Sequence, residues 1–192
     1  ILLLVGALAG TWKVSGVIPA MVYYGLQLID PSIFLPLSLI VSSIVSVSTG
    51  SSYTTSATVG IALVAVGTAF QIPPGMTAGA VISGAYFGDK LSPLSDTTNL
   101  APAMAGTDLY THIKYMTYTT VPTILITLVV FSIISLNINT ESSGNLDSIT
   151  SLTDTIINDF YISPILFMVP VSVIILATLK VKPVIALSIG IS

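Results

Sequence analysis

The sequence predicts an all-α integral membrane protein. Apolar residues make up 53% of the 192 residues and charged residues only 7%, against about 25% charged residues in soluble domains. Apolar runs close to the ~20 residues that a spanning helix needs recur along the chain. We expect about five or six segments that cross or enter the membrane. The first and last apolar runs are incomplete, so we expect a fragment of a longer transporter or channel.

The composition excludes several classes of protein. The chain has no cysteine, which excludes disulfides and thiolate metal sites, and its single histidine cannot form a zinc centre. The net charge of −3, without a basic stripe, argues against nucleic acid as a partner. We expect a transporter rather than an enzyme, with no cofactor. The expected partners are transported ions and membrane lipids, and a homodimer is compatible with the sequence.

Residues 1–29 predict two helical segments that are interrupted at residues 10–13, where Gly10, Trp12 and Lys13 break an apolar run. A single kinked helix over the same residues is the alternative. Such a helix would be about 43 Å long, against a hydrocarbon core of about 30 Å. In the two-segment interpretation, Trp12 and Lys13 lie at a membrane interface.

Residues 33–70 predict a re-entrant helical hairpin. The apolar stretches Ile33–Ser48 and Tyr53–Phe70 are each marginal in length for a full crossing, and the tip between them carries no charge. Such a tip suits backbone that is buried in protein at membrane depth. Two ordinary spans packed through small residues are the alternative. Three serines at i, i+4 spacing share one face of the first stretch and point toward the tip: Ser38, Ser42 and Ser46.

Residues 76–105 predict a discontinuous transmembrane helix. Met76–Gly88 forms its first half and Thr97–Ala105 its second half. The stretch Asp89–Asp96 between them is not regular helix, because Pro93 has no amide hydrogen and restricts the residue before it.

The polar connection after this helix predicts a stop and a new start. Gly106 is the expected helix stop, and Thr107 is the candidate N-cap of the next helix. Further on, Thr120, Thr123 and Thr127 form a stripe, which we interpret as helix packing with an ion pathway as the alternative.

The rest of the chain predicts two full spans around an acidic loop. The spans are residues 115–136 and 161–179, the extracellular loop is 137–160, and 183–192 begins a further span. The loop carries acidic residues and neither lysine nor arginine. The positive-inside rule therefore places the basic side in the cytoplasm, with Lys13, His112, Lys114, Lys180 and Lys182.

The break in the helix is the predicted ion-binding site. Ionisable groups at membrane depth are costly and are kept mainly where they carry ions or protons. A broken helix also leaves free backbone carbonyls, which coordinate hard cations. Oxygen side chains of the break and of the hairpin tip are the supporting ligands that we expect: Ser92, Ser95, Thr97, Thr98, Asn99, Thr49, Ser51, Ser52, Thr54 and Thr55.

Asp89 and Asp96 are the predicted ion carriers. Burial favours the neutral form of a carboxyl group, so Na⁺ and a proton compete for the same side chain. Asp96 is the favoured carrier because it lies between Pro93 and the restarting helix, and its alternative role is an N-cap. We expect Na⁺ at Asp96, Asp89 and Asn99. Lys90 is either a counter-charge to Asp89 or a group that tunes its pKa.

The string GDKLSPLSDTTNLAP over Gly88–Pro102 resembles the hallmark of the NhaC-type sodium/proton antiporter family. Residues 10–25 and 49–60 also resemble that family. The resemblance implies one half of an inverted-repeat fold, in which each repeat carries a re-entrant hairpin and a broken helix. It implies that the tip at 49–55 and the break at 89–99 meet near the membrane midplane. It also implies a multi-pass protein of the bacterial inner membrane.

The expected function is secondary active antiport, with Na⁺ exported in exchange for H⁺. Na⁺-coupled exchange of a carboxylate such as malate or lactate is the alternative, because the family includes such exchangers and the free amides at Thr97–Asn99 suit an anion. A passive cation channel is a weaker alternative. An intramembrane aspartyl protease is disfavoured, because its two carboxylates must face each other from two helices.

Overall fold

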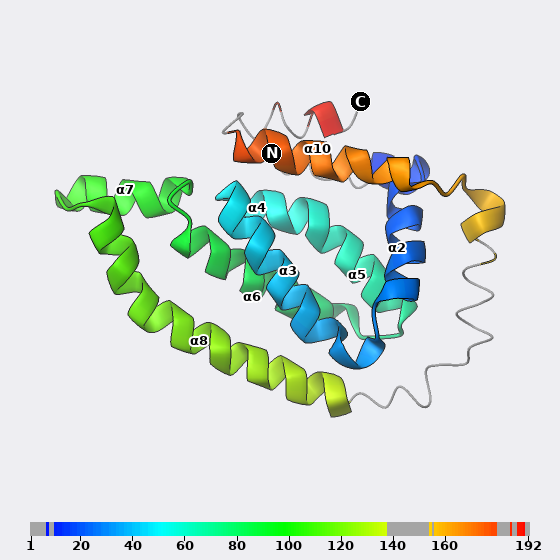
Figure 1. The fold of residues 1–192 in the computed structure, drawn as a ribbon, viewed down its shortest axis with the longest axis horizontal. Helices are drawn as coiled ribbons and strands as arrows, with labels where there is room; N and C mark the ends of the chain where they lie inside the picture. The colour runs from blue at the N-terminus through cyan, green and yellow to red at the C-terminus, as the bar shows by residue number, and fades with distance from the viewer. Residues whose placement is uncertain are drawn as a thin grey trace.

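The computed structural model describes residues 7, 10–137, 154, 156–179, 185 and 188–190. Residues 138–153 of the predicted acidic loop, Lys180, Lys182 and most of 183–192 lie outside the described residues. The described elements are helical and run in this order: α2 (Val17–Leu28), η1 (Pro31–Ile33), α3 (Phe34–Thr49), α4 (Ser52–Thr55), the π-helical segment η2 (Ser56–Gly60), α5 (Ile61–Ala69), α6 (Pro74–Leu91), α7 (Asp96–Ala105), α8 (Leu109–Asn137), η4 (Pro164–Phe167) and α10 (Met168–Thr178) (Figure 1).

The helices form a bundle with two distinct ends. The start of α3, the end of α5, the start of α6 and the end of α8 gather at one end (Figure 1). α7 extends away from the other end, beyond the tip between α3 and α4 (Figure 1). Among the described residues, three helices are long and apolar enough to cross a membrane: Pro31–Thr49, Ser52–Ala69 and Leu109–Asn137. The chain is therefore an all-α membrane protein.

Two expected boundaries differ from those of the structure. Residues 10–14 are helical, and the interruption predicted at 10–13 lies instead at Ser15 and Gly16. Gly16 has φ 87°, a left-handed conformation that glycine adopts without steric cost and that ends one helix before α2 begins. In the predicted span 161–179, regular helix begins only at Pro164, and the α-helical part, α10, has 11 residues.

The cap of α8 also differs from the expectation. Gly106 ends α7 in the left-handed conformation, as predicted, with φ 68°. The residue that caps α8 is Asp108 rather than Thr107, because a carboxylate oxygen of Asp108 accepts a 3.0 Å hydrogen bond from the amide of Thr111. A negative charge there also favours the helix dipole.

The hairpin at 34–69 turns at Gly50. This residue has φ 66° and ends α3, and the hydroxyl of Ser51 then accepts a hydrogen bond from the amide of Thr54 and caps α4. The returning helix widens to π geometry over Ser56–Gly60, beside Val81 of α6. The structure thus has a helix–turn–helix hairpin with a chargeless tip, which sequence reasoning predicted, and a π segment, which it did not.

The closest helix contact in the bundle joins α3 to α6. The serine stripe of α3 faces this contact, and Ser46 donates a hydrogen bond to the carbonyl of Ala85. Gly84 and Gly88 let the two backbones approach: a Cβ on Gly84 would overlap the carbonyl oxygen of Leu39. Ser38, Ser42 and Ser46 are fully buried in this contact, so they serve helix packing rather than lining the tip.

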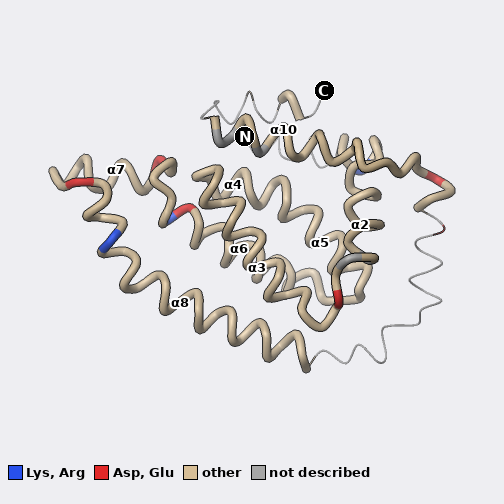
Figure 2. Tube along the Cα trace, viewed as in Figure 1, with Lys and Arg blue, Asp and Glu red and all other residues tan. Residues whose placement is uncertain are grey.

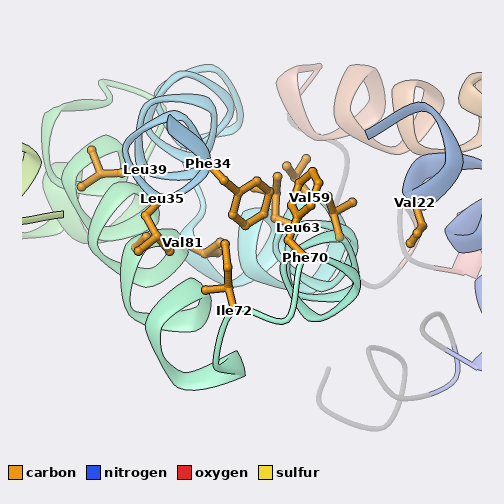
Figure 3. Packing of buried hydrophobic residues seen from close by; sticks show 11 residues of the cluster. Val22, Phe34, Leu35, Leu39, Val59, Leu63, Phe70, Ile72 and Val81 are labelled. Carbon is orange, nitrogen blue, oxygen red and sulfur yellow. The ribbon is translucent and has the colours of Figure 1, made fainter. Parts of the chain in front are cut away.

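The hydrophobic core lies between α3, α5 and α6. Phe34 and Phe70 meet edge to face with ring centroids 5.4 Å apart, at the end of the hairpin away from the tip. Leu35 and Leu39 of α3 belong to the same buried cluster as Val81 of α6 (Figure 3). This core fixes α3 and α6 side by side and holds the two ends of the hairpin together.

Charged residues are nearly absent from the helices that form this core. Figure 2 shows an acidic and a basic position side by side at the end of α6, and α3, α4 and α5 without charge. Asp30 lies in the exposed turn before α3, where hydrogen bonds from the Ser32 hydroxyl and then its amide lower the pKa of that carboxyl. Among the described residues of α3, α4, α5 and α6, the charged positions are thus Asp89, which is half-buried, and its exposed neighbour Lys90 at the end of α6.

We predict that Gly84→Ala lowers the free energy of unfolding by about 1–3 kcal/mol, because the added methyl group must push α3 away from α6. Gly75→Ala is the matched control, since nothing lies within 4 Å of a Cβ at that position. Thermal unfolding of the purified full-length protein in detergent measures both. Equal melting temperatures for the two variants would contradict the tight α3–α6 contact.

Candidate ion-binding site

The break between α6 and α7 is shorter than predicted. α6 continues to Leu91 and α7 begins at Asp96, so only residues 92–95 are unwound. Asp89 and Asp96 thus belong to the helical turns that flank the break. The physical reason is that Pro93 restricts only the residue before it, Ser92, which is extended with ψ 126°. A helix can therefore run to Leu91 unhindered.

Ser95, and not Asp96, caps the second half-helix. The hydroxyl of Ser95 accepts a hydrogen bond from the amide of Thr98 at 3.5 Å. Asp96 follows in the first turn of α7, where its charge favours the helix dipole and its side chain is exposed. The N-cap role considered for Asp96 is therefore wrong.

The hairpin tip and the helix break lie against each other. The hydroxyl of Ser92 donates a 2.7 Å hydrogen bond to the carbonyl of Val47, at the end of α3. A Cβ on Gly50 would lie 2.6 Å from the carbonyl carbon of Leu94. Glycine is thus needed at residue 50 both for the turn and for this approach.

Asp89 lies where the two segments meet. Its Oδ2 accepts a 3.1 Å hydrogen bond from the hydroxyl of Ser52 in the tip, and its Oδ1 accepts a 2.7 Å hydrogen bond from Ser95 in the break. The hydroxyl of Thr97 lies 2.9 Å from that of Ser95. One half-buried carboxylate of α6 therefore accepts hydrogen bonds from a hydroxyl of α4 and a hydroxyl of the break, and a hydroxyl of α7 adjoins the latter.

The backbone carbonyls at the end of α6 are not free, contrary to the expectation for a broken helix. The Thr98 hydroxyl donates to the carbonyls of Asp89, at 3.0 Å, and Lys90, at 3.1 Å. This side chain replaces the amides that the unwound residues no longer provide. Sequence reasoning had assigned Thr98 to the ion; the structure gives it a capping contact.

Several predicted ligands lie outside this cluster. Asp96 is exposed and makes no side-chain hydrogen bond within the described residues. The Asn99 amide nitrogen donates to the carbonyls of Pro93 and Ser95, at 2.8 and 2.7 Å, and so stabilises the break. In the tip, the Thr49 and Thr55 hydroxyls lie 3.4 Å apart, and that of Thr55 donates to the carbonyl of Ser51. Thr54 is buried beside them.

Lys90 points away from Asp89. Within the part of the chain that the structure describes, no ion pair joins them, so the local pair considered for Asp89 does not form. Adjacent residues on a helix are about 100° apart, and the Lys90 side chain lines a cavity between α6 and α8 instead. The threonine stripe of α8 lines the same cavity. The sequence predicted the threonine stripe, but not that the stripe and Lys90 line one cavity.

The hydroxyl groups around Asp89 can serve either protonation state. Ser52 and Ser95 donate to an ionised carboxylate, and by rotating their O–H bonds they accept from a carboxylic acid or offer lone pairs to a cation. The position of Asp89 in the last turn of α6 adds the negative end of the helix dipole. The arrangement thus gathers one carboxylate and several hydroxyl oxygens, which are the kinds of ligand that hard cations take.

Comparison with known proteins gives one consistent result. Residues 84–192 match the model of the "Na+/H+ antiporter family". The chain is 41% identical over its whole length to the Na(+)/H(+) antiporter NhaC of Alkalihalophilus pseudofirmus, of which it covers 41%. It is 44% identical, over 95% of its length, to the malate-2H(+)/Na(+)-lactate antiporter of Bacillus subtilis, of which it covers 39%.

A third relative is the arginine/ornithine antiporter ArcD of Halobacterium salinarum. It is 41% identical over 71% of this chain, and the match covers 28% of the length of that antiporter. The chain spans about two fifths of the length of the first two relatives. No solved structure matches it. Because the family model covers more than half of the chain, including the whole helix break, the chain belongs to the Na⁺/H⁺ antiporter family.

Proposed function

We propose that this chain is part of a secondary transporter that exports Na⁺ in exchange for H⁺ across the bacterial inner membrane. The observation that carries the proposal is Asp89, a lone carboxylate held between Ser52 of the hairpin tip and Ser95 of the helix break. Na⁺ and a proton compete for this carboxylate. The antiporter relatives support the same exchange.

The exchange cycle follows from the hydrogen bonds. With a proton on Asp89, the carboxylic acid donates to one serine oxygen, and the site carries no charge. Loss of the proton creates a carboxylate in the last turn of α6, where the helix dipole makes an unpaired negative charge unfavourable. Na⁺ neutralises that charge and takes oxygens from Asp89, Ser52, Ser95 and Thr97. Return of a proton releases Na⁺.

The level at which the helix break lies beside α8 supports a position of the break inside the membrane. The Ser135 hydroxyl near the end of α8 donates to the carbonyl of Pro31 at the start of the hairpin, and Thr119 lines a cavity with Lys90. If the span predicted for 115–136 marks the hydrocarbon layer, Thr119 lies four residues, or about 6 Å, inside it. We therefore propose that the hairpin is re-entrant and that the break lies nearer the face where α8 begins.

The topology proposed from the basic residues is compatible with this arrangement. The turn before α3, the start of α6 and the end of α8 share one end of the bundle, which we propose as the outer face (Figure 1). Lys114 follows the start of α8, which belongs to the opposite, cytoplasmic face. The chain then supplies one half of an inverted-repeat transporter, with one broken helix and one hairpin.

A second candidate function is Na⁺-coupled exchange of a carboxylate. The malate/lactate antiporter of Bacillus subtilis is 44% identical to this chain and favours it. In this function Na⁺ still binds at Asp89, and the carboxylate occupies a separate place.

We predict that Asp89→Asn reduces Na⁺-driven proton flux to background, because an amide can neither release a proton nor neutralise Na⁺. Asp96→Asn, the matched control in the next helix, retains flux within about threefold of wild type. The measurement is dequenching of a pH-sensitive dye in vesicles that contain the full-length transporter. Wild-type exchange by Asp89→Asn would reject the proposal, provided that the amounts of folded protein are equal.

We predict that Ser52→Ala weakens Na⁺ binding without abolishing transport. Loss of one neutral ligand costs about 1 kcal/mol, so the Na⁺ concentration for half-maximal flux rises about fivefold. Ser48→Ala is the control, because its hydroxyl donates to the carbonyl of Ile44 in its own helix. An unchanged half-maximal concentration for Ser52→Ala would remove the hairpin tip from the site.

We predict that the two functions separate in a flux assay with and without organic acid. A simple Na⁺/H⁺ antiporter gives the same Na⁺-driven proton flux whether malate and lactate are present or absent. A carboxylate exchanger gives flux only with a carboxylate on both sides of the membrane. Radiolabelled lactate uptake into malate-loaded vesicles, with Asp89→Asn in parallel, measures the second case directly.

A further inference from the structure

A groove between α6 and α8 is lined by a lysine and several hydroxyl residues that Na⁺/H⁺ exchange at Asp89 does not use. Its cavity has a volume of about 290 Å³, at the lower end of the range for small-molecule pockets. Lys90 is the charged residue that lines it, and the aromatic residues Tyr86 and Phe87 cover part of its wall. Five hydroxyl residues line the rest: Ser83, Thr119, Thr120, Thr123 and Thr127.

The hydroxyl groups of this groove are arranged as acceptors. Ser83 donates to the carbonyl of Gly79, Thr123 to that of Thr119 and Thr127 to that of Thr123, at 2.7, 2.7 and 2.8 Å. Each hydroxyl hydrogen is thus used within its own helix, and each oxygen keeps lone pairs for an outside donor. The groove therefore suits a ligand that carries an O–H or N–H group.

Lys90 supplies a positively charged hydrogen-bond donor beside these acceptors. It has no ion-pair partner among the described residues, and its ammonium group is an obligatory donor with a full charge. A charge close to the hydrocarbon layer requires an anion, a polar partner or water. Asp89 does not meet this need, because both of its oxygens accept hydrogen bonds on the other side of the helix.

Phe131 borders the groove beyond its last threonine. One turn beyond Thr127, the ring of Phe131 packs over Gly79, where a Cβ would lie 3.5 Å from the ring tip.

We propose that this groove is a binding pocket for a small hydroxy acid, with Lys90 as the partner of the carboxylate and the threonine oxygens as acceptors for the hydroxyl group. The proposal rests on the proposed transport function and assigns the carboxylate a place apart from Na⁺. Asp89 holds the cation on the hairpin side of α6, and Lys90 holds the anion on the α8 side. The groove requires no movement of the Asp89 cluster to be filled.

Cysteine protection in the full-length transporter tests the pocket, because these 192 residues contain no cysteine of their own. Any cysteine elsewhere is first replaced by serine. Thr123→Cys places a thiol in the groove, and Leu125→Cys places one on the exposed apolar face of α8. Thr111→Cys, exposed in the first turn, is the positive control for reaction. The probes are a sulfonate-bearing and a trimethylammonium-bearing methanethiosulfonate.

The proposal predicts that Thr123→Cys reacts faster with the anionic than with the cationic reagent and that Leu125→Cys reacts with neither. A ligand at twice its dissociation constant leaves about one third of the pocket empty, so lactate slows the reaction about threefold. Propionate, which lacks the hydroxyl group, protects less, and chloride does not protect. Lys90→Gln abolishes both the reagent preference and the protection, and Lys90→Arg restores them.

Three results would overturn the pocket: no reaction at Thr123→Cys while Thr111→Cys reacts, equal reaction at Leu125→Cys, or equal protection by lactate and propionate. These results leave Asp89-dependent Na⁺/H⁺ exchange untouched. Conversely, exchange that survives Asp89→Asn rejects the proposed function whether or not lactate protects. The two failures are therefore distinguishable.

Discussion

The site depends on the close approach of α3 and α6. Glycines 84 and 88 on one helix and buried serines on the other bring the two backbones into contact, and the Phe34–Phe70 contact holds the two ends of the hairpin together. Because the contact continues to the end of both helices, the tip at Gly50 must meet the break at Leu94. The hydrogen bond from Ser52 to Asp89 is a consequence of that register.

The same packing explains why many polar side chains near the site contact the protein backbone. A broken helix and a tight turn leave backbone groups without partners, and at membrane depth water does not satisfy them. Thr98 satisfies two carbonyls of α6, Asn99 satisfies two carbonyls of the break, and Ser92 ties the break to α3. These side chains keep the unwound backbone satisfied, which leaves Asp89, Ser52, Ser95 and Thr97 as the ligands that we propose for the ion.

Much of this arrangement was predictable from the sequence. Prolines, glycines and the lengths of the apolar runs fixed the order of the helices, the tip and the break to within a few residues. The contact of the tip with Asp89 rather than with Asp96 was not predictable, because it depends on which side of α6 the tip lies against. The sequence favoured Asp96 for its nearness to Pro93, whereas the structure exposes Asp96 and surrounds Asp89 with hydroxyl groups. The serine stripe was misjudged for the same reason: its spacing reveals a face, but not which helix covers that face.

The neighbouring charges at the end of α6 suggest how a cation and an anion would influence each other. Asp89 and Lys90 are adjacent in sequence but face different helices, so in the proposed mechanism each takes its own ion, and their charges lie close enough to influence each other. An empty, ionised Asp89 partly compensates the charge of Lys90. Once Na⁺ neutralises Asp89, Lys90 is left uncompensated and its attraction for a carboxylate increases. By linkage, a carboxylate in the groove must strengthen Na⁺ binding by the same factor. Two opposite charges on different sides of the end of α6 are thus sufficient to couple the proposed cation and carboxylate sites without any change of fold.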